Sequence, residues 1–456
     1  MTRPPVPPTA ARLRAFALRA GVALLPALLP AGTCAQTAPG VEARLLDELA
    51  RMQGELARLR DEVERLKRDR AQTAPAVSAA DGVPIVTTVT IPAASAPRDI
   101  AAERASPLSV FGYGELNYAR PTRDPSQAVA TARRGVIGLG YRFDERTRVA
   151  IELEIEDAIA SASDRGEVAF EQLYVEHDLT PSLSAKAGLF LLPVGYLNEV
   201  HEPTRYYGVT RNFVETAIIP TTWRELGIGL RGTTDAGLRW DAGLVTGFDL
   251  GRWDAGTTEG RESPLGAIHQ EGSQARARSL AAYAALNWNG RPGVNLGGSV
   301  YAGGAGHKQA DFAGADASIT LAEAHARWSP GRLELTALSA AGRFRNIDAL
   351  NATFAGQSTP IPARFGGSYV QAAYRAWDGG PLRLVPFARY ERFDTAAGGF
   401  PGLPTGLAPA TDGATRVWTA GASLYLNPQV VLKLDYQRFL DRSALDRLNL
   451  GVGFHF

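Results

Sequence analysis

The 456-residue chain has one cysteine, two methionines and, after its first thirty residues, no long apolar run. A helix that spans a bilayer needs about 18 to 20 consecutive apolar residues, so a helical membrane protein is excluded. A transmembrane β-barrel stays open, because its polar interior positions alternate with apolar exterior ones and cancel in the average. The 48 glycines agree with a strand-rich chain.

The first 35 residues have the pattern of an export signal. Arginines precede an apolar core at 21–29 (GVALLPALL), which is followed by the small residues Thr33-Cys34-Ala35. Removal of residues 1–35 takes away four arginines and no acidic residue, which leaves 44 basic and 47 acidic side chains. This balance gives no reason to expect nucleic acid as a partner. Because Cys34 leaves with the signal, we expect no disulfide and no thiolate chemistry.

A heptad pattern follows, and it predicts a periplasmic coiled-coil helix over residues 36–70. A lone amphipathic helix is the alternative, but three heptads are marginally stable in water without partners. Residues 71–106 are rich in Ala, Pro, Ser and Thr and predict an extended linker. The apolar heptad positions are Leu45, Leu49, Met52, Leu56, Leu59, Val63 and Leu66.

Residues 107–456 alternate between apolar and polar side chains, and they predict about 16 strands. The last strand ends on Phe456 with apolar residues at every second position, as the lipid-facing side of a bilayer-crossing strand requires. The expected strands are 108–119, 132–143, 146–158, 167–178, 182–191, 223–232, 237–247, 276–288, 293–304, 316–328, 331–344, 367–377, 381–393, 415–427, 429–440 and 446–456.

Short and long connections alternate between these strands. Outer-membrane barrels show this asymmetry, with tight periplasmic turns and longer external loops. We therefore predict an all-β fold, a 16-stranded antiparallel transmembrane β-barrel over 107–456, with the coiled coil in the periplasm. The short connections are 144–145, 180–181, 233–235, 290–292, 329–330, 378–380 and 427–428.

Strand alternation also predicts which charged side chains face the lumen. Glu152, Glu154 and Glu156 form a row that would be costly in lipid. Acidic and basic strips could create a transverse field across the pore, or could pair across strands, as Glu152 and Glu154 with Arg142 and its neighbours. The same rule assigns to the interior Arg134, Arg142, Lys186, Glu225, Arg231, Arg239, Asp241, Glu323, His325, Arg327, Lys433 and Asp435.

Aromatic residues near strand ends suit the interfacial girdles of a barrel, although a soluble β-protein could bury them in its core. The residues expected in girdles are Tyr141, Trp223, Trp240, Trp288, Trp328, Trp377, Trp418 and Tyr425.

The connection 193–222 is the longest of the first half, and loops of about 30 residues are usually functional. We predict that it folds into the lumen and narrows it, rather than lying over the mouth or against a neighbouring subunit. Its side chains expected at the constriction are Glu199, Arg205, Tyr206, Arg211 and Glu215.

Enzymatic chemistry is not expected. Glu199, His201 and Glu202 could be compared with a metal site, but a single histidine with two acids in a loop is more often a solvated cluster. Neither a nucleophile elbow nor a phosphate-binding loop is present, so we expect no catalytic residues, no metal and no cofactor.

Three stretches of the chain resemble the central region of the phosphate-selective porin O and P family of outer-membrane porins. These are FEQLYVE at 170–176, AGLF at 187–190 with PVG at 193–195, and WRELG at 223–227. The resemblance implies a trimeric 16-stranded channel with an N-terminal periplasmic extension. It also implies a basic anion path, for which Arg205, Arg211, Arg224 and Arg231 are the nearest candidates. The row Glu152 to Glu156 departs from an anion-only lumen.

The sequence thus predicts a porin in the cell outer membrane for passive diffusion of small hydrophilic solutes or ions. Inorganic anions such as phosphate are a preference implied by the resemblance. The expected partners are outer-membrane lipid, two further copies of the chain in a homotrimer, and a periplasmic or cell-wall partner of the coiled coil. The alternative is a barrel-anchored coiled-coil tether that links the outer membrane to the cell wall.

Overall fold

The computed structural model describes residues 54, 58, 65, 106–158, 166–411 and 413–456. The expected signal peptide, coiled coil and linker, and with them the tether hypothesis, lie outside the described residues apart from residues 54, 58, 65 and 106. The elements are β1 Leu108–Pro121, η1 Pro125–Gln127, β2 Val129–Arg142, β3 Thr147–Glu156, β4 Val168–Thr180, β5 Leu183–Leu191, η2 Val214–Ile218, β6 Arg224–Thr233, β7 Leu238–Val245, η3 Leu250–Arg252, α2 Glu259–Glu262, η4 Gly266–Ile268, β8 Ala281–Arg291, β9 Val294–Gly304, β10 Ser318–Trp328, β11 Leu333–Arg345, α3 Asp348–Thr353, β12 Arg364–Tyr374, β13 Trp377–Gly379, β14 Leu382–Asp394, β15 Thr415–Asn427, β16 Val430–Phe439, η5 Ser443–Leu445 and β17 Arg447–His455.

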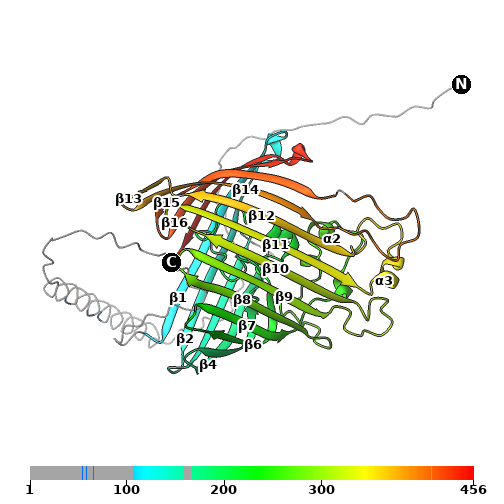
Figure 1. Ribbon diagram of the computed structural model, residues 1–456, viewed down its shortest axis with the longest axis horizontal. Helices are drawn as coiled ribbons and strands as arrows, with labels where there is room; N and C mark the ends of the chain where they lie inside the picture. The colour runs from blue at the N-terminus through cyan, green and yellow to red at the C-terminus, as the bar shows by residue number, and fades with distance from the viewer. Residues whose placement is uncertain (1–53, 55–57, 59–64, 66–105, 159–165, 412) are drawn as a thin grey trace, which may run out of the picture. The chain divides into compact units, whose positions relative to one another are not determined.

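The strands form one closed antiparallel barrel (Figure 1). β1 pairs with β2 on one side and with β17 on the other. The short β13 and the longer β12 pair with the same side of β14 and together form one stave, so the barrel has 16 strands. Closure leaves no strand edge with unpaired backbone groups, which is the condition for a sheet to exist in lipid. The predicted antiparallel barrel is confirmed.

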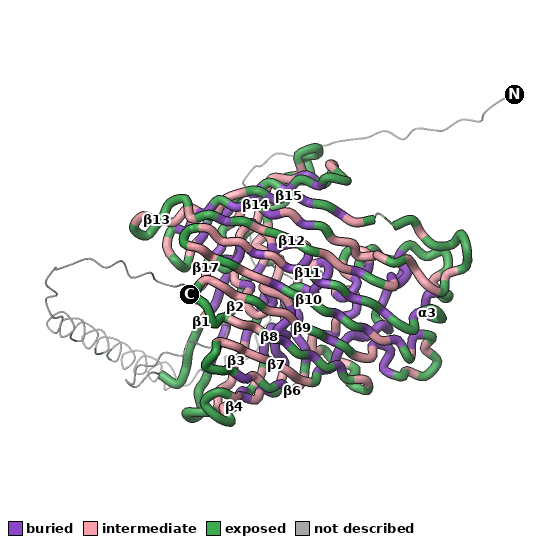
Figure 2. Tube along the Cα trace, in the orientation of Figure 1, coloured by how far each residue is buried: buried purple, intermediate pink, exposed green. Residues whose placement is uncertain are grey.

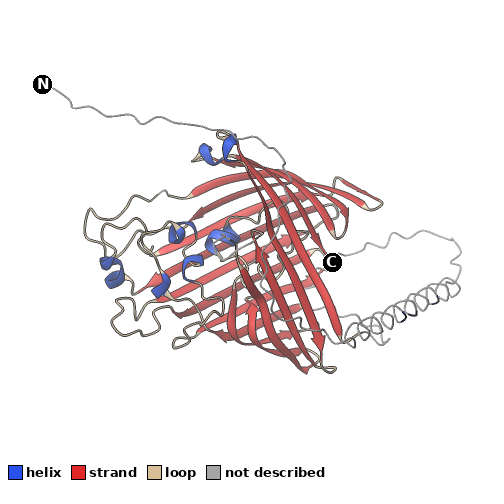
Figure 3. Cartoon of the chain, turned by 180° about the vertical axis from the view of Figure 1, so that it is seen from behind, coloured by secondary structure: helices blue, strands red, loops and turns tan. Residues whose placement is uncertain are grey.

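The alternation of connection lengths is confirmed as well. Connections such as 181–182 and 234–237 hold two to four residues at one end of the barrel, here called the short-turn end. At the opposite, long-loop end they include 192–223 and 246–280, and every short helix of the described chain lies in this set (Figure 3). None of the described helices is long and apolar enough to cross a membrane.

The eighth strand begins later than the sequence predicts, at Ala281 instead of residue 276. The side chain of Gln270 accepts from the backbone N–H of Arg276 at 2.7 Å and donates to its carbonyl at 3.1 Å. The N–H of Ser279 donates to His307 Nδ1 at 3.3 Å. This backbone is therefore held by neighbouring connections and cannot extend the strand ladder.

The barrel wall has an apolar outside and a polar inside. Ile137, Ile228, Val300 and Val370 are each more than half exposed on the outer face. The residues that alternate with them point inward and are buried, and Figure 2 shows this alternation along the strands. Soluble proteins do not expose a continuous apolar surface of this kind.

Two of the aromatic residues expected in girdles lie inside instead. Trp223 precedes β6 where the chain returns from the long connection, and its ring stacks on Phe248 with centroids 4.9 Å apart. Tyr425 on β15 donates its hydroxyl to the carbonyl of Thr204 at 3.1 Å. The girdle assignment is wrong for both, because the folded connection inside the barrel provides them with partners. Trp328, Trp377 and Trp418 are exposed.

Two β-bulges change which side chains reach the lumen. The register of β1 with β2 shifts after Glu115, and that of β3 with β4 shifts after Glu152. In the second bulge Glu171 is the extra residue, so Glu171 and Gln172 are both buried although they are adjacent in sequence. A bulge re-aims side chains in this way, and strict alternation of positions cannot foresee it.

Candidate functional site

Residues 192–223, here called the inner loop, fold into the barrel interior. The loop is closed at its base by the N–H of Leu192, which donates to the carbonyl of Trp223 at 3.0 Å. Asn198 reinforces this base. Its side-chain amide donates to the carbonyls of Leu192 and Trp223 at 2.8 and 2.9 Å and accepts from the N–H of Trp223 at 2.7 Å. The predicted loop therefore starts and ends at one point of the rim.

The descending arm of the loop reaches toward the short-turn end. Glu199 accepts from Arg239 at 2.6 Å and from Arg231 with its other oxygen. Arg231 also donates to Asp241 at 2.6 Å, so two arginines and two carboxylates balance one another. Burial alone would raise the pKa of Glu199, but attraction by Arg231 and Arg239 outweighs it and lowers the pKa below its usual range.

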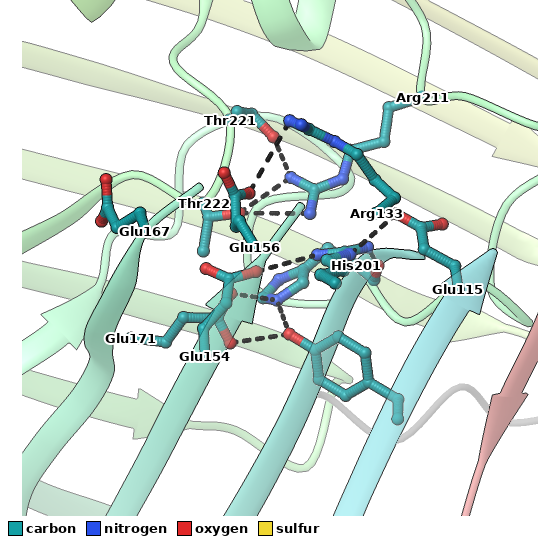
Figure 4. A network of polar contacts seen from close by, with 12 residues as sticks. Glu115, Arg133, Glu154, Glu156, Glu167, Glu171, His201, Arg211, Thr221 and Thr222 are labelled. Carbon is teal, nitrogen blue, oxygen red and sulfur yellow. Dashed lines mark hydrogen bonds and ion pairs between the residues drawn. The ribbon is translucent and has the colours of Figure 1, made fainter. Parts of the chain in front are cut away.

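His201 fastens the loop to three strands. Its Nε2 lies 2.6 Å from the hydroxyl of Tyr113 on β1 and 3.1 Å from Glu171 on β4. Arg134 on β2 donates to the His201 carbonyl at 2.7 Å. Figure 4 shows His201 beside Glu171, with Arg211 lying further toward the top of the view. The bulge at Glu171 thus brings a second charged residue, beside Arg134, against the same position of the loop.

The three side chains that could be compared with a metal site have separate partners. Glu199 pairs with arginines and His201 with Glu171, whereas Glu202 lies 4.0 Å from Arg205. Among the described residues no group of three His, Cys, Asp or Glu could hold a metal ion.

The ascending arm returns to the long-loop end along the opposite wall. The hydroxyl of Tyr206 donates to Glu115 at 2.6 Å, and Lys433 Nζ lies 3.7 Å from the centre of its ring. Further up, the N–H of Val209 donates to Asp435 at 2.6 Å on β16. The loop therefore touches strands on all sides of the lumen and stands between the two ends of the barrel.

Glu215 holds the two arms together. It lies in η2 and accepts from the N–H groups of Tyr196 and Leu197 at 2.5 and 2.6 Å, and from the side chains of Asn212 and Tyr369 at 2.7 and 3.1 Å. Burial raises the pKa of Glu215, and these donors partly offset the rise. The sequence predicts that Glu215 lies at the constriction. In the structure Glu215 holds the inner loop in shape by bonding both of its arms.

A cavity opens on each side of the inner loop. At the short-turn end a cavity of about 380 Å³ is lined by the descending arm and by Arg239, His325 and Arg327. At the long-loop end a cavity of about 820 Å³ is lined by Phe213 of the ascending arm and by the neighbouring connections. The loop is the partition between these two spaces.

The acidic row Glu152, Glu154 and Glu156 faces the lumen, but it does not pair with Arg142, the partner expected for it. Glu152 accepts from Gln172 at 2.8 Å, and Glu154 lies 4.0 Å from Arg134. Arg142 is exposed and stands opposite Arg148. Arg142 itself is therefore the wrong partner, because the register places it near the turn and four residues away from Gly138, which pairs with Glu152, whereas Arg134 on the same strand does lie near Glu154. Glu156 lies 3.7 Å from Arg133.

The basic candidates differ in how far they are neutralised. Arg224 is buried between Glu167 and Glu271, each at 3.1 Å, and Arg231 has two carboxylates. Arg211 donates to Thr222 at 3.1 Å and to Thr221, and no described carboxylate lies within 4.0 Å of it. Arg205 is exposed into the short-turn-end cavity.

Lys186 is a further cation without a neighbouring carboxylate. Its Nζ lies 4.1 Å from the centre of the Phe190 ring, and no described carboxylate lies within 4.0 Å. Among the candidate residues, Arg211 and Lys186 are therefore buried cations without a close carboxylate, and Arg205 is the cation that lines a cavity.

Sequence reasoning missed Tyr113, Glu115 and Glu171. Tyr113 and Glu115 occupy alternate positions of β1 that both face the lumen. A glutamate among the aromatic residues of this strand could have indicated a lumen-facing site. Glu171 had no such signal because the bulge reverses the parity of its position.

Comparison with known proteins agrees with this geometry. No protein-family model matches the chain. OmpF of Salmonella typhi, in its complex with daunomycin, superposes with a TM-score of 0.52 at 12% identity, over 76% of this chain and 97% of that one. The fold is thus that of an outer-membrane porin barrel. An anion-selective porin from Comamonas acidovorans also matches, with a TM-score of 0.47 and 13% identity over 76% of this chain and 99% of that one.

One relative shows the family. An uncharacterized protein of Aquifex aeolicus strain VF5 is 30% identical over 364 residues, which cover 76% of this chain and 80% of the relative. The chain belongs to the same family as this protein.

Proposed function

We propose that the protein is a passive porin of the outer membrane, through which small hydrophilic solutes and ions diffuse. The observation that carries this proposal is the closed barrel with apolar side chains outside, charged side chains inside and a folded loop across the lumen. Such a wall satisfies every backbone group within lipid and leaves a polar path through it.

The orientation and the N-terminal regions belong to the same proposal. The long connections face outward from the cell, and the short turns face the periplasm, as in outer-membrane barrels. Residues 1–35 act as a signal peptide, 36–70 form a periplasmic coiled coil, 71–106 are a linker and 107–456 are the barrel. The heptad pattern supports an oligomer, since a short heptad helix needs partners, and the resemblance to the porin family makes a homotrimer our choice.

An anion preference is the finer part of the proposal. Arg211 and Lys186 have no described carboxylate within 4.0 Å, and Arg205 has one at 4.0 Å and is exposed, whereas Arg224 and Arg231 are neutralised by closer carboxylates. Guanidinium groups bind oxyanions through two parallel hydrogen bonds, so phosphate-like anions suit Arg205 and Arg211. This agrees with the resemblance to the phosphate-selective porin O and P family, which remains a hypothesis.

The central test is conductance. Purified protein added to a planar lipid bilayer in KCl is expected to produce stepwise increases in current. A membrane that stays silent, although the protein has inserted into it, would contradict the proposal.

The membrane position of the outer face gives a first prediction. Val300 lies in the middle of β9 and points outward. We expect Val300→Arg to lower the free energy of unfolding in lipid vesicles by about 2–4 kcal/mol, the cost of a cation near the bilayer centre. Reversible folding in urea measures this difference. Val300→Leu is the control and should change it little; equal stability of the two variants would show that this face does not meet lipid.

The anion preference gives a second prediction. Arg211→Gln and Arg205→Gln should each lower the permeability of chloride relative to potassium, because each removes a positive charge from the proposed path. Reversal potentials across a KCl gradient measure the ratio. Arg123→Gln removes an exposed arginine from the connection 122–128 and serves as the control. If all three variants shifted the potential equally, net charge and not the path would be responsible.

A further inference from the structure

The cavity at the long-loop end has an unusual lining, here called the aromatic vestibule and defined by Phe213, Phe393, Phe400, Phe439 and Arg447. It lies at the point where the ascending arm of the inner loop reaches the rim. On the proposed orientation it is the entrance to the narrow part of the channel, so a role for it in solute uptake rests on the proposed porin function.

The rings form a packed cluster that still reaches the cavity. Phe213 stacks on Phe393 with centroids 5.4 Å apart and planes 17° from parallel, and it meets the edge of Phe439 at 5.6 Å. Phe213, Phe393 and Phe400 are each partly exposed. Aromatic faces turned toward water cost free energy, and a planar apolar group that covers them recovers it.

A cation stands beside these rings. The guanidinium carbon of Arg447 lies 5.9 Å from the centre of Phe213 and 5.7 Å from that of Phe439. Its Nε donates to Gln437 at 2.7 Å, and no described carboxylate lies within 4.0 Å of its nitrogens. Arg231 and Arg134, by contrast, are held by glutamate or aspartate side chains. Arg447 therefore keeps its charge available at the edge of the aromatic surface.

The acidic side chains of the same cavity already have donors. Glu262 accepts from the hydroxyl of Thr258 at 2.8 Å, and Asp394 accepts from the N–H of Ala396 at 2.9 Å. Glu262 lies in α2, and Asp394 follows Phe393 at the end of β14. Arg261 and Arg442 also line the cavity, and Arg447 is the cation that lies against the rings of Phe213 and Phe439.

We propose that the aromatic vestibule binds small carboxylates that carry an aromatic ring, and that the channel admits these solutes in preference to other anions of similar size. The ring of such a solute covers Phe213 and its neighbours, while its carboxylate pairs with Arg447. An inorganic anion uses only the cation, and an uncharged aromatic uses only the rings. A solute that offers both groups gains from both contacts.

The test uses the full-length protein in planar bilayers with KCl and adds sodium benzoate as the probe. We expect benzoate to reduce the KCl current with a saturable concentration dependence. Acetate and benzyl alcohol at the same concentrations should have little effect, because each lacks one of the two groups. An equal reduction by acetate, or by benzyl alcohol, would overturn the proposal.

Variants locate the effect. Phe213→Leu, Phe393→Leu and Arg447→Gln should each raise the benzoate concentration for half-maximal block by about tenfold, the effect of losing one ring or ion contact. Arg438→Gln, on the outer face of β16 beside Phe439, is the matched control and should leave it unchanged. Retained KCl steps show that each variant has folded.

The outcomes separate the two proposals. No KCl steps from the wild-type protein would overturn the porin function itself. Normal steps without block by benzoate, or block that all three vestibule variants leave unchanged, would overturn the vestibule alone.

Discussion

Glu199→Gln is expected to shift the channel strongly toward anions. Glu199 is the carboxylate that both Arg231 and Arg239 share from the loop side, so its neutral analogue leaves these two cations with Asp241 alone. The narrow part of the lumen then gains one net positive charge where water is limited and charges are weakly screened. We expect the permeability of chloride relative to potassium to rise severalfold.

Reversal potentials across a KCl gradient measure this change. Glu145→Gln is the matched control, because Glu145 is exposed in the short turn between β2 and β3, away from the inner loop. The two variants lose the same charge but differ in position relative to the paired arginines. An equal shift in both would show that the cluster around Glu199 does not line the conducting path.

Glu215→Leu is expected to release the inner loop and enlarge the pore. Leucine has a similar volume but accepts no hydrogen bond, so it leaves the N–H groups of Tyr196 and Leu197 without their partner. A buried donor without a partner costs about 1–3 kcal/mol, and two backbone donors and two side chains are affected together. We expect the single-channel conductance in KCl to rise severalfold and the current to become noisier.

Protease access gives an independent readout of the same change. Trypsin cleaves after arginine, and Arg205 and Arg211 lie in the loop that Glu215 holds. Cleavage there should appear in the Glu215→Leu barrel and not in the wild type. Glu202→Leu, the same substitution on the same loop, should resemble the wild type. Unchanged conductance together with resistance to trypsin would refute the role of Glu215.

The barrel could be predicted from the sequence because its two strongest constraints are local. A strand with one face in lipid must alternate between apolar and polar side chains, and every turn at one end of the barrel is short. The boundaries therefore agree within a few residues, except at 276–280, where the side chain of Gln270 captures the backbone. That capture depends on a contact between connections, which no local pattern contains.

The site was less predictable because it depends on register and on tertiary contacts. The bulge at Glu171 turns an outward position inward, and the partner of Glu152 follows from the stagger between strands. Composition did indicate that the connection 193–222 carries functional side chains. It could not indicate that Glu215 joins the two arms, or that Trp223 and Tyr425 leave the girdles to meet the loop.

The seam between the first and last strands has a consequence for assembly. Thr204 lies 2.7 Å from His455 on β17, and Tyr206 bonds Glu115 on β1, so neighbouring residues of the inner loop fasten both sides of the same joint. These sites come together only when the final stave has been added. A partly assembled barrel therefore lacks the contacts that hold its inner loop. The width of the channel is set only when the first and last strands pair.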